Sequence, residues 1–168
     1  MTKNFKIVKI NYDYCNYLRQ FDSKVVYNAG IKEMRPFIGI LFIINDCEYF
    51  APLSSPKDKH KHMKNNIDVI KLKNGELGVV NLNNMIPVNK DNYKLIELDE
   101  KTDNTTIIKW HNLLKKQLQW LNRNSTNIRS KANKLYKMYI NNSIPERIKI
   151  RTCNFILLEE KCKEHKKD

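Results

Sequence analysis

The chain has 168 residues, 41% of them hydrophobic and 10% aromatic, which excludes a disordered protein and is enough for a core that needs no disulfide or metal. Lysine and arginine number 31 against 18 acidic residues, giving a formal charge of +13 and a pI near 9.6. Such an excess indicates a polyanionic partner, with nucleic acid ahead of an anionic membrane surface, although a generally basic protein stays open.

The first hundred residues predict a mainly antiparallel sheet. Alternating apolar residues over 5–10 predict a strand, and helical spacing over 12–21 predicts a short helix capped by Asn11 or Asp13. The nearly continuous apolar run 36–45 predicts a central strand that is buried on both faces. A turn at its end returns the chain along a partner strand over 47–53.

Shorter strands are predicted in the next segment. Residues 67–72 form one strand, and Asn74–Gly75 is the strongest short hairpin signal of the chain. The partner strand begins at Glu76, and two shorter strands, interrupted by Pro87, follow within 84–98.

The second half changes to a helical period. Apolar residues recur every three or four positions from Ile107 to Leu121, and again from Ile128 to Tyr139, which predicts two amphipathic helices. A last helix is predicted over 154–165. We therefore expect one α+β domain over 1–168, sheet-rich over 1–100 and helical over 104–165.

The four cysteines are widely spaced and form no CxxC pair. No apolar leader precedes them, and no apolar run is long enough to cross a bilayer. This pattern is typical of reduced thiols in the cytoplasm, and it predicts a cytoplasmic protein with no metal and no cofactor.

The positive charge is concentrated in one segment. Between Lys109 and Arg151 there are seven lysines and four arginines against one acid, Glu146. Membrane binding would need an exposed apolar face, whereas these apolar stripes are expected in the core, so RNA or another single strand is favoured over duplex DNA and membranes. The predicted RNA contacts from this segment lie mostly off the apolar stripes: Lys115, Lys116, Arg123, Arg129, Lys131, Lys134 and Lys137.

A candidate catalytic turn follows the strand over 47–53. Its sequence "SSPK" places the hydroxyls of Ser54 and Ser55 and the ammonium of Lys57 in a turn stiffened by prolines. RNA cleavage without metal requires proton transfer from the 2′-OH and to the 5′ oxygen, together with stabilisation of charge on the phosphorane. The turn predicts Lys57 as a phosphate clamp or proton carrier, with Ser54 and Ser55 as donors that position the phosphate, although such tetrapeptides are often only polar loops.

The basic run after this turn supplies further candidates. Lys59, His60 and Lys61 are predicted to contact phosphates in an exposed segment. His60 and His62 are considered as a general acid or base because histidine titrates near neutrality. Their i, i+2 spacing makes them a poor metal pair.

Five segments together resemble the ToxN/AbiQ family, the toxins of type III toxin–antitoxin systems. They are "YLRQFDSKV", "RPFIGILF", "YFAPLSSPKDKH", "GELGVVNLNNMIPV" and "CNFILLEEKC". Together they span nearly the whole chain, and the combination of "PLSSPK" with "NNMIPV" is the most specific part.

The resemblance implies a strongly twisted antiparallel sheet, a barrel-like core similar to Kid/MazF toxins, flanked by helices. It implies a metal-independent endoribonuclease that leaves 2′,3′-cyclic phosphate and 5′-OH ends on messenger RNA and on its own antitoxin precursor. The antitoxin of the family is a structured repeat RNA, a pseudoknot, which forms a closed ring with the toxin, commonly three of each. Such systems act in plasmid maintenance and in abortive infection against phage.

The family's catalytic turn falls on Ser54, Ser55 and Lys57, with Ser54 at a position that is often threonine. The family's active-site tyrosine best matches Tyr27. The alternative from another class is a non-catalytic RNA-binding protein that uses the basic helices, in which "SSPK" only docks a phosphate. The third class considered is a peripheral membrane protein.

Overall fold

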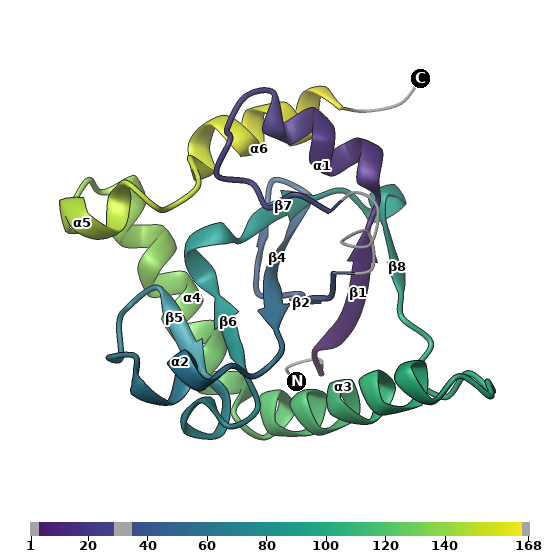
Figure 1. Ribbon diagram of the computed structural model, residues 1–168. Helices are drawn as coiled ribbons and strands as arrows, with labels where there is room; N and C mark the ends of the chain where they lie inside the picture. Colours follow the sequence, from purple (N-terminus) through teal and green to yellow (C-terminus); the bar gives the residue numbers. More distant parts are fainter. Residues whose placement is uncertain (1–3, 29–34, 166–168) are drawn as a thin grey trace.

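The computed structural model describes residues 4–28 and 35–165, which form an antiparallel sheet flanked by helices (Figure 1). The sheet has eight strands in the order β5-β6-β4-β2-β1-β8, with β3 and β7 each paired to β4. This confirms the α+β class. The strands are β1 (Lys6–Ile10), β2 (Phe37–Gly39), β3 (Ile43–Ile44), β4 (Cys47–Ser54), β5 (Val69–Lys71), β6 (Val79–Asn81), β7 (Ile86–Val88) and β8 (Tyr93–Leu95).

Strand β4 is the centre of the sheet. Residues 47–53 are all buried, and β4 pairs with four other strands, β2, β3, β6 and β7. A strand covered on both faces is apolar almost throughout, and "CEYFAPL" fits this rule although the sequence suggested only a partner strand.

The predicted single strand over 36–45 was wrong in its continuity, because the run is divided into β2 and β3. At Gly39 an added Cβ would lie 2.5 Å from the Phe50 ring and 2.9 Å from the Tyr49 carbonyl oxygen. The backbone therefore lies tightly against β4 at this point. Leu41 N–H then donates to the Tyr49 carbonyl, so the two segments continue one ladder along the same neighbour.

The predicted hairpin at Asn74–Gly75 is confirmed in its pairing, because β5 and β6 are antiparallel partners. Its connection is longer than a two-residue turn and contains the 3-10 turn η2 (Leu72–Gly75). Lys73, Asn74 and Gly75 all have positive φ, and an added Cβ on Gly75 would lie 2.5 Å from the His60 carbonyl oxygen. Close packing against the segment around His60 therefore accounts for this wider loop.

The helices begin where the sequence supplies caps. Asn104 Oδ1 accepts N–H bonds from Thr106 and Ile107, and Asn11 Oδ1 accepts from Asp13, as helix N-caps do. The short α2 and α5 were not predicted, because neither is long enough to show an apolar stripe. The helices are α1 (Tyr12–Arg19), α2 (Asp58–His62), α3 (Thr105–Arg123), α4 (Ser125–Ile140), α5 (Glu146–Lys149) and α6 (Phe155–Glu164), with further 3-10 turns η3 (Leu82–Asn84) and η4 (Lys90–Asn92).

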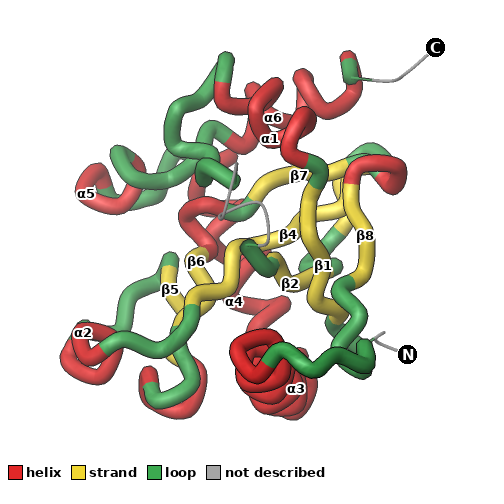
Figure 2. The backbone as a smooth tube through the Cα atoms, turned by 45° about the vertical axis from the view of Figure 1, so that its right-hand side comes forward, coloured by secondary structure: helices red, strands yellow, loops and turns green. Residues whose placement is uncertain are grey.

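The helices surround the sheet at its ends and side. In Figures 1 and 2, α1 and α6 lie together at one end of the sheet and α3 lies at the other. Helix α4 buries Ile128, Ala132 and Leu135 in the same core as the strands. The larger of these side chains, Ile128 and Leu135, each contribute about 1.5–3 kcal/mol when fully buried, so α4 is held firmly against the sheet.

The four cysteines are buried and free, as the sequence suggested. In the part of the chain that the structure describes, no helix is both long and apolar enough to cross a membrane.

Candidate active site

The candidate turn leaves the end of the central strand. Ser54 is the last residue of β4 and pairs with Val79 of β6, whereas Ser55, Pro56 and Lys57 are exposed. Helix α2 begins directly afterwards at Asp58. The predicted hydroxyl and ammonium groups therefore lie on a short exposed link between a buried strand and a one-turn helix.

His60 closes this link from inside the molecule. The Lys57 N–H donates to His60 Nδ1 over 3.1 Å, and the Lys57 carbonyl accepts the His60 N–H over 2.9 Å. Burial, and then the charges of Lys59 and Lys57, lower the pKa of His60 below its ordinary value. The imidazole is therefore neutral near pH 7, with its proton on Nε2 because Nδ1 accepts a hydrogen bond.

The predicted surface position of His60 was wrong, because only 2% of the residue is exposed. It fixes the backbone of the turn, where a contact with RNA was expected. Lys59 and Lys61 are exposed, and their RNA contacts stay predictions.

Helix α3 holds the other side of the turn. Gln117 Nε2 donates to the Ser54 carbonyl over 3.3 Å and to the Leu77 carbonyl over 2.7 Å. Gly78 has φ +103°, and an added Cβ there would lie 2.0 Å from the Ser54 oxygen. The sequence reasoning missed both residues, although Gln117 stands on the apolar stripe between Leu114 and Leu121, where a lone amide is a signal.

The Ser54 side chain has a neighbour on β6. Its Oγ accepts a long hydrogen bond of 3.5 Å from Asn81 Nδ2. The backbone and the side chain of Ser54 are thus contacted from different elements, α3 and β6. The structure fixes this hydroxyl more firmly than that of the exposed Ser55.

Tyr27 lies on the loop after α1, 48% exposed, with the Arg19 guanidinium 5.4 Å from its ring centroid. The loop is anchored to η3, because Asn84 Nδ2 donates to the Lys24 carbonyl over 3.0 Å. Within residues 4–28 and 35–165, no hydrogen bond joins Tyr27 to the turn. Its catalytic role stays a prediction.

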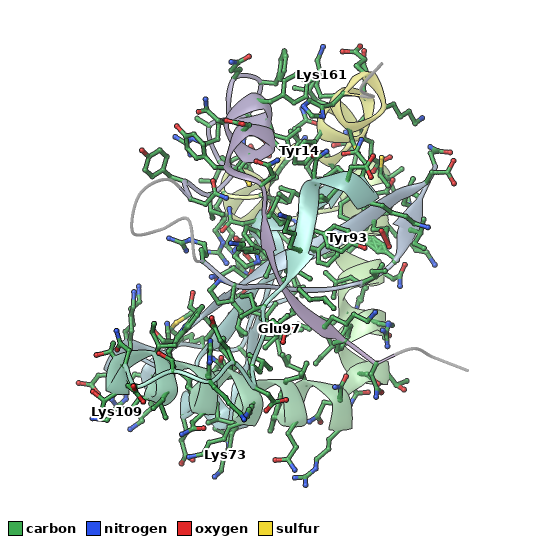
Figure 3. All side chains as sticks on the ribbon, turned by 90° about the vertical axis from the view of Figure 1, so that its right-hand side faces the viewer. Tyr14, Lys73, Tyr93, Glu97, Lys109 and Lys161 are labelled. Carbon is green, nitrogen blue, oxygen red and sulfur yellow. The ribbon has the colours of Figure 1, made fainter. Side chains whose placement is uncertain are left out.

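The predicted RNA-binding cations of α3 and α4 fall into two groups. Lys116, Arg123, Lys134 and Lys137 are exposed. Figure 3 shows the side chains of α3 projecting at one end of the molecule, where Lys109 is labelled.

The second group contacts the protein itself. Lys115 binds Asp99 over 2.8 Å, the Arg129 guanidinium lies 4.2 Å from the Phe5 ring centroid, and Lys131 Nζ donates to the Val69 carbonyl over 2.7 Å. Burial lowers the pKa of both Arg129 and Lys131. The contacts of Arg129 and Lys131 stabilise the fold, whereas the exposed pair of Lys115 with Asp99 contributes little. The RNA contacts of all three residues stay predictions.

An ion pair between the buried Asp68 carboxylate and the partly exposed Arg151 lies beside β5, and sequence reasoning missed it. Arg151 donates to both oxygens of Asp68 over 2.6 and 2.9 Å, and Asn83 Nδ2 donates to the same carboxylate over 2.8 Å. Burial alone raises the pKa of Asp68, but the bonds from Arg151 and Asn83 outweigh it and lower that pKa. The carboxylate therefore stays charged at neutral pH.

The functional groups at the turn are the hydroxyls of Ser54 and Ser55, the ammonium of Lys57, and backbone N–H groups. These groups can hold phosphate oxygens and stabilise negative charge. Across the described ranges, no three or more histidine, cysteine, aspartate or glutamate side chains gather so that they could hold a metal ion.

Comparisons with known proteins agree on one family. The family model described as "Toxin ToxN, type III toxin-antitoxin system" matches residues 6–163. An endoribonuclease ToxN from Bacillus thuringiensis subsp. kurstaki is 35% identical over 167 residues, covering 97% of this chain and 85% of that protein.

Two solved structures agree in fold. A type III toxin inhibited by a non-coding RNA pseudoknot superposes with TM-score 0.83 at 35% identity, covering 99% of this chain and all of that one. AbiQ, a lactococcal anti-phage endoribonuclease, gives TM-score 0.83 at 27% identity, covering 97% and 98% of the two chains. The chain described by these strands and helices belongs to the ToxN family of type III toxin–antitoxin toxins.

Proposed function

We propose that this chain is the endoribonuclease toxin of a type III toxin–antitoxin system. It cleaves messenger RNA and its repeat RNA antitoxin precursor, leaving 2′,3′-cyclic phosphate and 5′-OH ends. The observation that carries the proposal is the exposed hydroxyl-and-ammonium turn, fixed by Gln117 of α3 on one side and by His60 on the other. Relatives named as endoribonucleases support it.

The turn supplies what a transesterification without metal requires. Ser54 and Ser55 position the phosphate oxygens, and the Lys57 ammonium stabilises the charge that develops on the phosphorane. The backbone of the turn is ordered by its contacts with α2, α3 and β6 before RNA binds. Little ordering of the protein is then needed at the moment of binding, which favours affinity and rate.

The antitoxin is proposed to bind the surface formed by the exposed cations of α3 and α4. Lys116, Arg123, Lys134 and Lys137 neutralise its phosphates, and the RNA covers the turn so that messenger RNA is excluded. By its resemblance to the family, we place the RNA and the toxin in a closed ring of three of each. The cytoplasm, where messenger RNA is found, is the proposed compartment.

The decisive experiment is cleavage of RNA by the purified protein in EDTA. Wild type is expected to give defined fragments with cyclic phosphate ends. Lys57→Ala is expected to cleave about 100-fold more slowly, since removal of one group that stabilises transition-state charge has about this effect. It keeps most of its antitoxin affinity, because many other cations share that role.

Lys90→Ala is the matched control, since Lys90 is exposed on η4 and outside the proposed site. Wild-type cleavage by Lys57→Ala would remove the site assignment. Retardation of RNA by wild type without any cleavage would favour the non-catalytic RNA-binding protein, and pelleting with anionic vesicles in preference to RNA would favour a membrane protein.

A further inference from the structure

A cavity of about 280 Å³ lies beside the proposed catalytic turn. Its lining comes from the segment between α2 and β5, from β5, β6 and η3, and from Arg151 just after α5. Figure 1 draws α2, β5, β6 and α5 together on the left of the molecule. The lining residues used below are Met63, Asn66, Val69, Asn81, Asn83 and Arg151.

Strand register places this cavity on the same face as the Ser54 side chain. Ser54 lies opposite Val79 on β6, and Asn81, two residues further along, lies opposite Val69 on β5. Opposed residues, and alternate residues of one strand, point to the same face of a sheet. The hydrogen bond from Asn81 Nδ2 to Ser54 Oγ agrees with this placement.

The walls combine apolar surface with a flat cation. Val69 is buried and Met63 is half-buried, so both offer apolar contact. The Arg151 side chain is 45% exposed, and its guanidinium is clamped by two bonds to the fully buried Asp68 carboxylate. An arginine held in this way presents a planar surface on which an unpaired base can stack.

Three side-chain amides complete the lining, and protein contacts already orient each of them. Asn83 donates to Asp68, Asn66 Oδ1 accepts from Arg147, and Asn81 donates to Ser54. An amide has one donor end and one acceptor end, so a bond that fixes one end leaves the other for a ligand. Oriented amides read the hydrogen-bonding edges of bases.

We propose that this cavity holds one nucleobase of the RNA strand, immediately beside the phosphate that is cut. The base packs against Met63 and the Arg151 guanidinium, and Asn81 reads its edge. Because Asn81 contacts both the cavity and Ser54, base identity and phosphate position are coupled. The inference rests on the proposed endoribonuclease function and names the residues that determine its sequence preference.

The test is cleavage of an RNA with randomised bases around the cut, followed by sequencing of the product ends. Asn81→Ala is expected to reduce base discrimination about ten-fold at one position next to the cut, the typical loss when one base-edge contact is removed. Met63→Ala, which touches no hydrogen bond of Ser54, is expected to weaken discrimination at the same position. Asn16→Ala, an exposed asparagine on α1, is the matched control and keeps the wild-type profile.

An equal loss of rate in all sequence contexts, with unchanged base preference in both variants, would overturn the proposal. If wild type itself does not cleave, the proposed function fails, and the nucleobase inference is then tested by measuring RNA binding instead. Short oligoribonucleotides carrying an abasic site at each position in turn are then compared on wild type and Asn81→Ala. One position whose base matters to wild type alone supports the cavity, whereas no such position contradicts it.

Discussion

Helix α3 and the segment from α4 to Arg151 both carry positive charge, but the second segment also uses part of its charge for bonds inside the protein. On α3, Lys116 and Arg123 are exposed, and Lys115 pairs only with the exposed Asp99. From α4 onward, Lys131 binds a strand carbonyl and Arg151 binds a buried carboxylate. One run of basic residues therefore contains both surface charge for a partner and internal bonds for the fold.

The difference arises from what each segment packs against. The strand β5 is three residues long and presents the Val69 carbonyl to α4. Asp68, the residue directly before the strand, presents its carboxylate to Arg151. Buried polar groups need partners, and the nearest cations supply them. Charge counts along the sequence thus overestimate the number of cations available to RNA.

The largest expected effect is on stability when Arg151 is removed. Arg151→Ala leaves the Asp68 carboxylate buried with only Asn83 as a side-chain partner. We expect a loss of about 3 kcal/mol in the free energy of unfolding, the low end for a broken buried pair because the guanidinium is half-exposed. Urea denaturation measures it.

Arg147→Ala is the matched control, because Arg147 is exposed and its bond to Asn66 is at the surface. It should change the free energy of unfolding by less than about 0.5 kcal/mol. Equal losses in the two variants would contradict the division between internal and surface cations.

On α4 itself, Lys131→Ala removes the ammonium that donates to the carbonyl of the buried residue Val69. The expected loss is about 1.5 kcal/mol of unfolding free energy. Lys134→Ala, at an exposed position one turn along the same helix, should unfold like wild type in the same urea titration. A stable Lys131→Ala protein would show that this lysine belongs with the surface cations.

The exposed and the internally bonded cations should also differ in RNA binding, and here the exposed ones should matter more. The measurement is RNA affinity as a function of salt concentration. Removing Lys134 or Lys137 is expected to reduce the slope of log affinity against log salt by about 0.7 each, the value for one phosphate contact of a single strand. Lys131→Ala should change the slope less, because its ammonium is already bound to the protein. Identical slopes for Lys131→Ala and Lys134→Ala would mean that both contact phosphate.

The smallest expected effect is a change in the pH dependence of stability, and it should differ between the buried His60 and the exposed His62. Because the folded pKa of His60 is below its ordinary value of 6.5, the unfolded chain binds more protons on acidification. Stability from His60 is present above pH 6.5 and declines as the pH falls through the folded pKa. His60→Asn, which keeps an acceptor for the Lys57 N–H, should lack this decline in urea titrations from pH 7 to 5.

His62→Asn is the matched control, since His62 is exposed on the same short helix. It should keep the wild-type dependence of the urea midpoint on pH. If the decline persisted in His60→Asn but disappeared in His62→Asn, the pH dependence would come from His62 and the prediction for His60 would be wrong.

Local patterns predicted much of this fold. The helical stripe from Ile107 to Leu121 and the pairing around Asn74–Gly75 depend on near neighbours, and both are confirmed. The "SSPK" turn was also located from its own residues, although its role is still proposed. In each case the determining information lies within a few positions of the chain.

Contacts between distant segments were not predictable in the same way. Arg151 and Asp68 are 83 residues apart, and the sequence offers no signal that joins them. His60 looked like one member of a basic surface run, and only its packing against the loop at Gly75 shows that it is internal. The division of residues 36–45 into β2 and β3 likewise depends on how closely Gly39 approaches β4.

The central position of β4 has a consequence for how the protein binds RNA. A strand that pairs with four others opens only when much of the sheet opens, so we expect its amide hydrogens to exchange with solvent among the slowest in the molecule. Ser54 is the last residue of that strand, so the protein side of the site is already rigid. When RNA binds, most of the conformational entropy that is lost is therefore that of the RNA. Unpaired, flexible segments of a transcript are the ones that can adapt to this rigid end of β4.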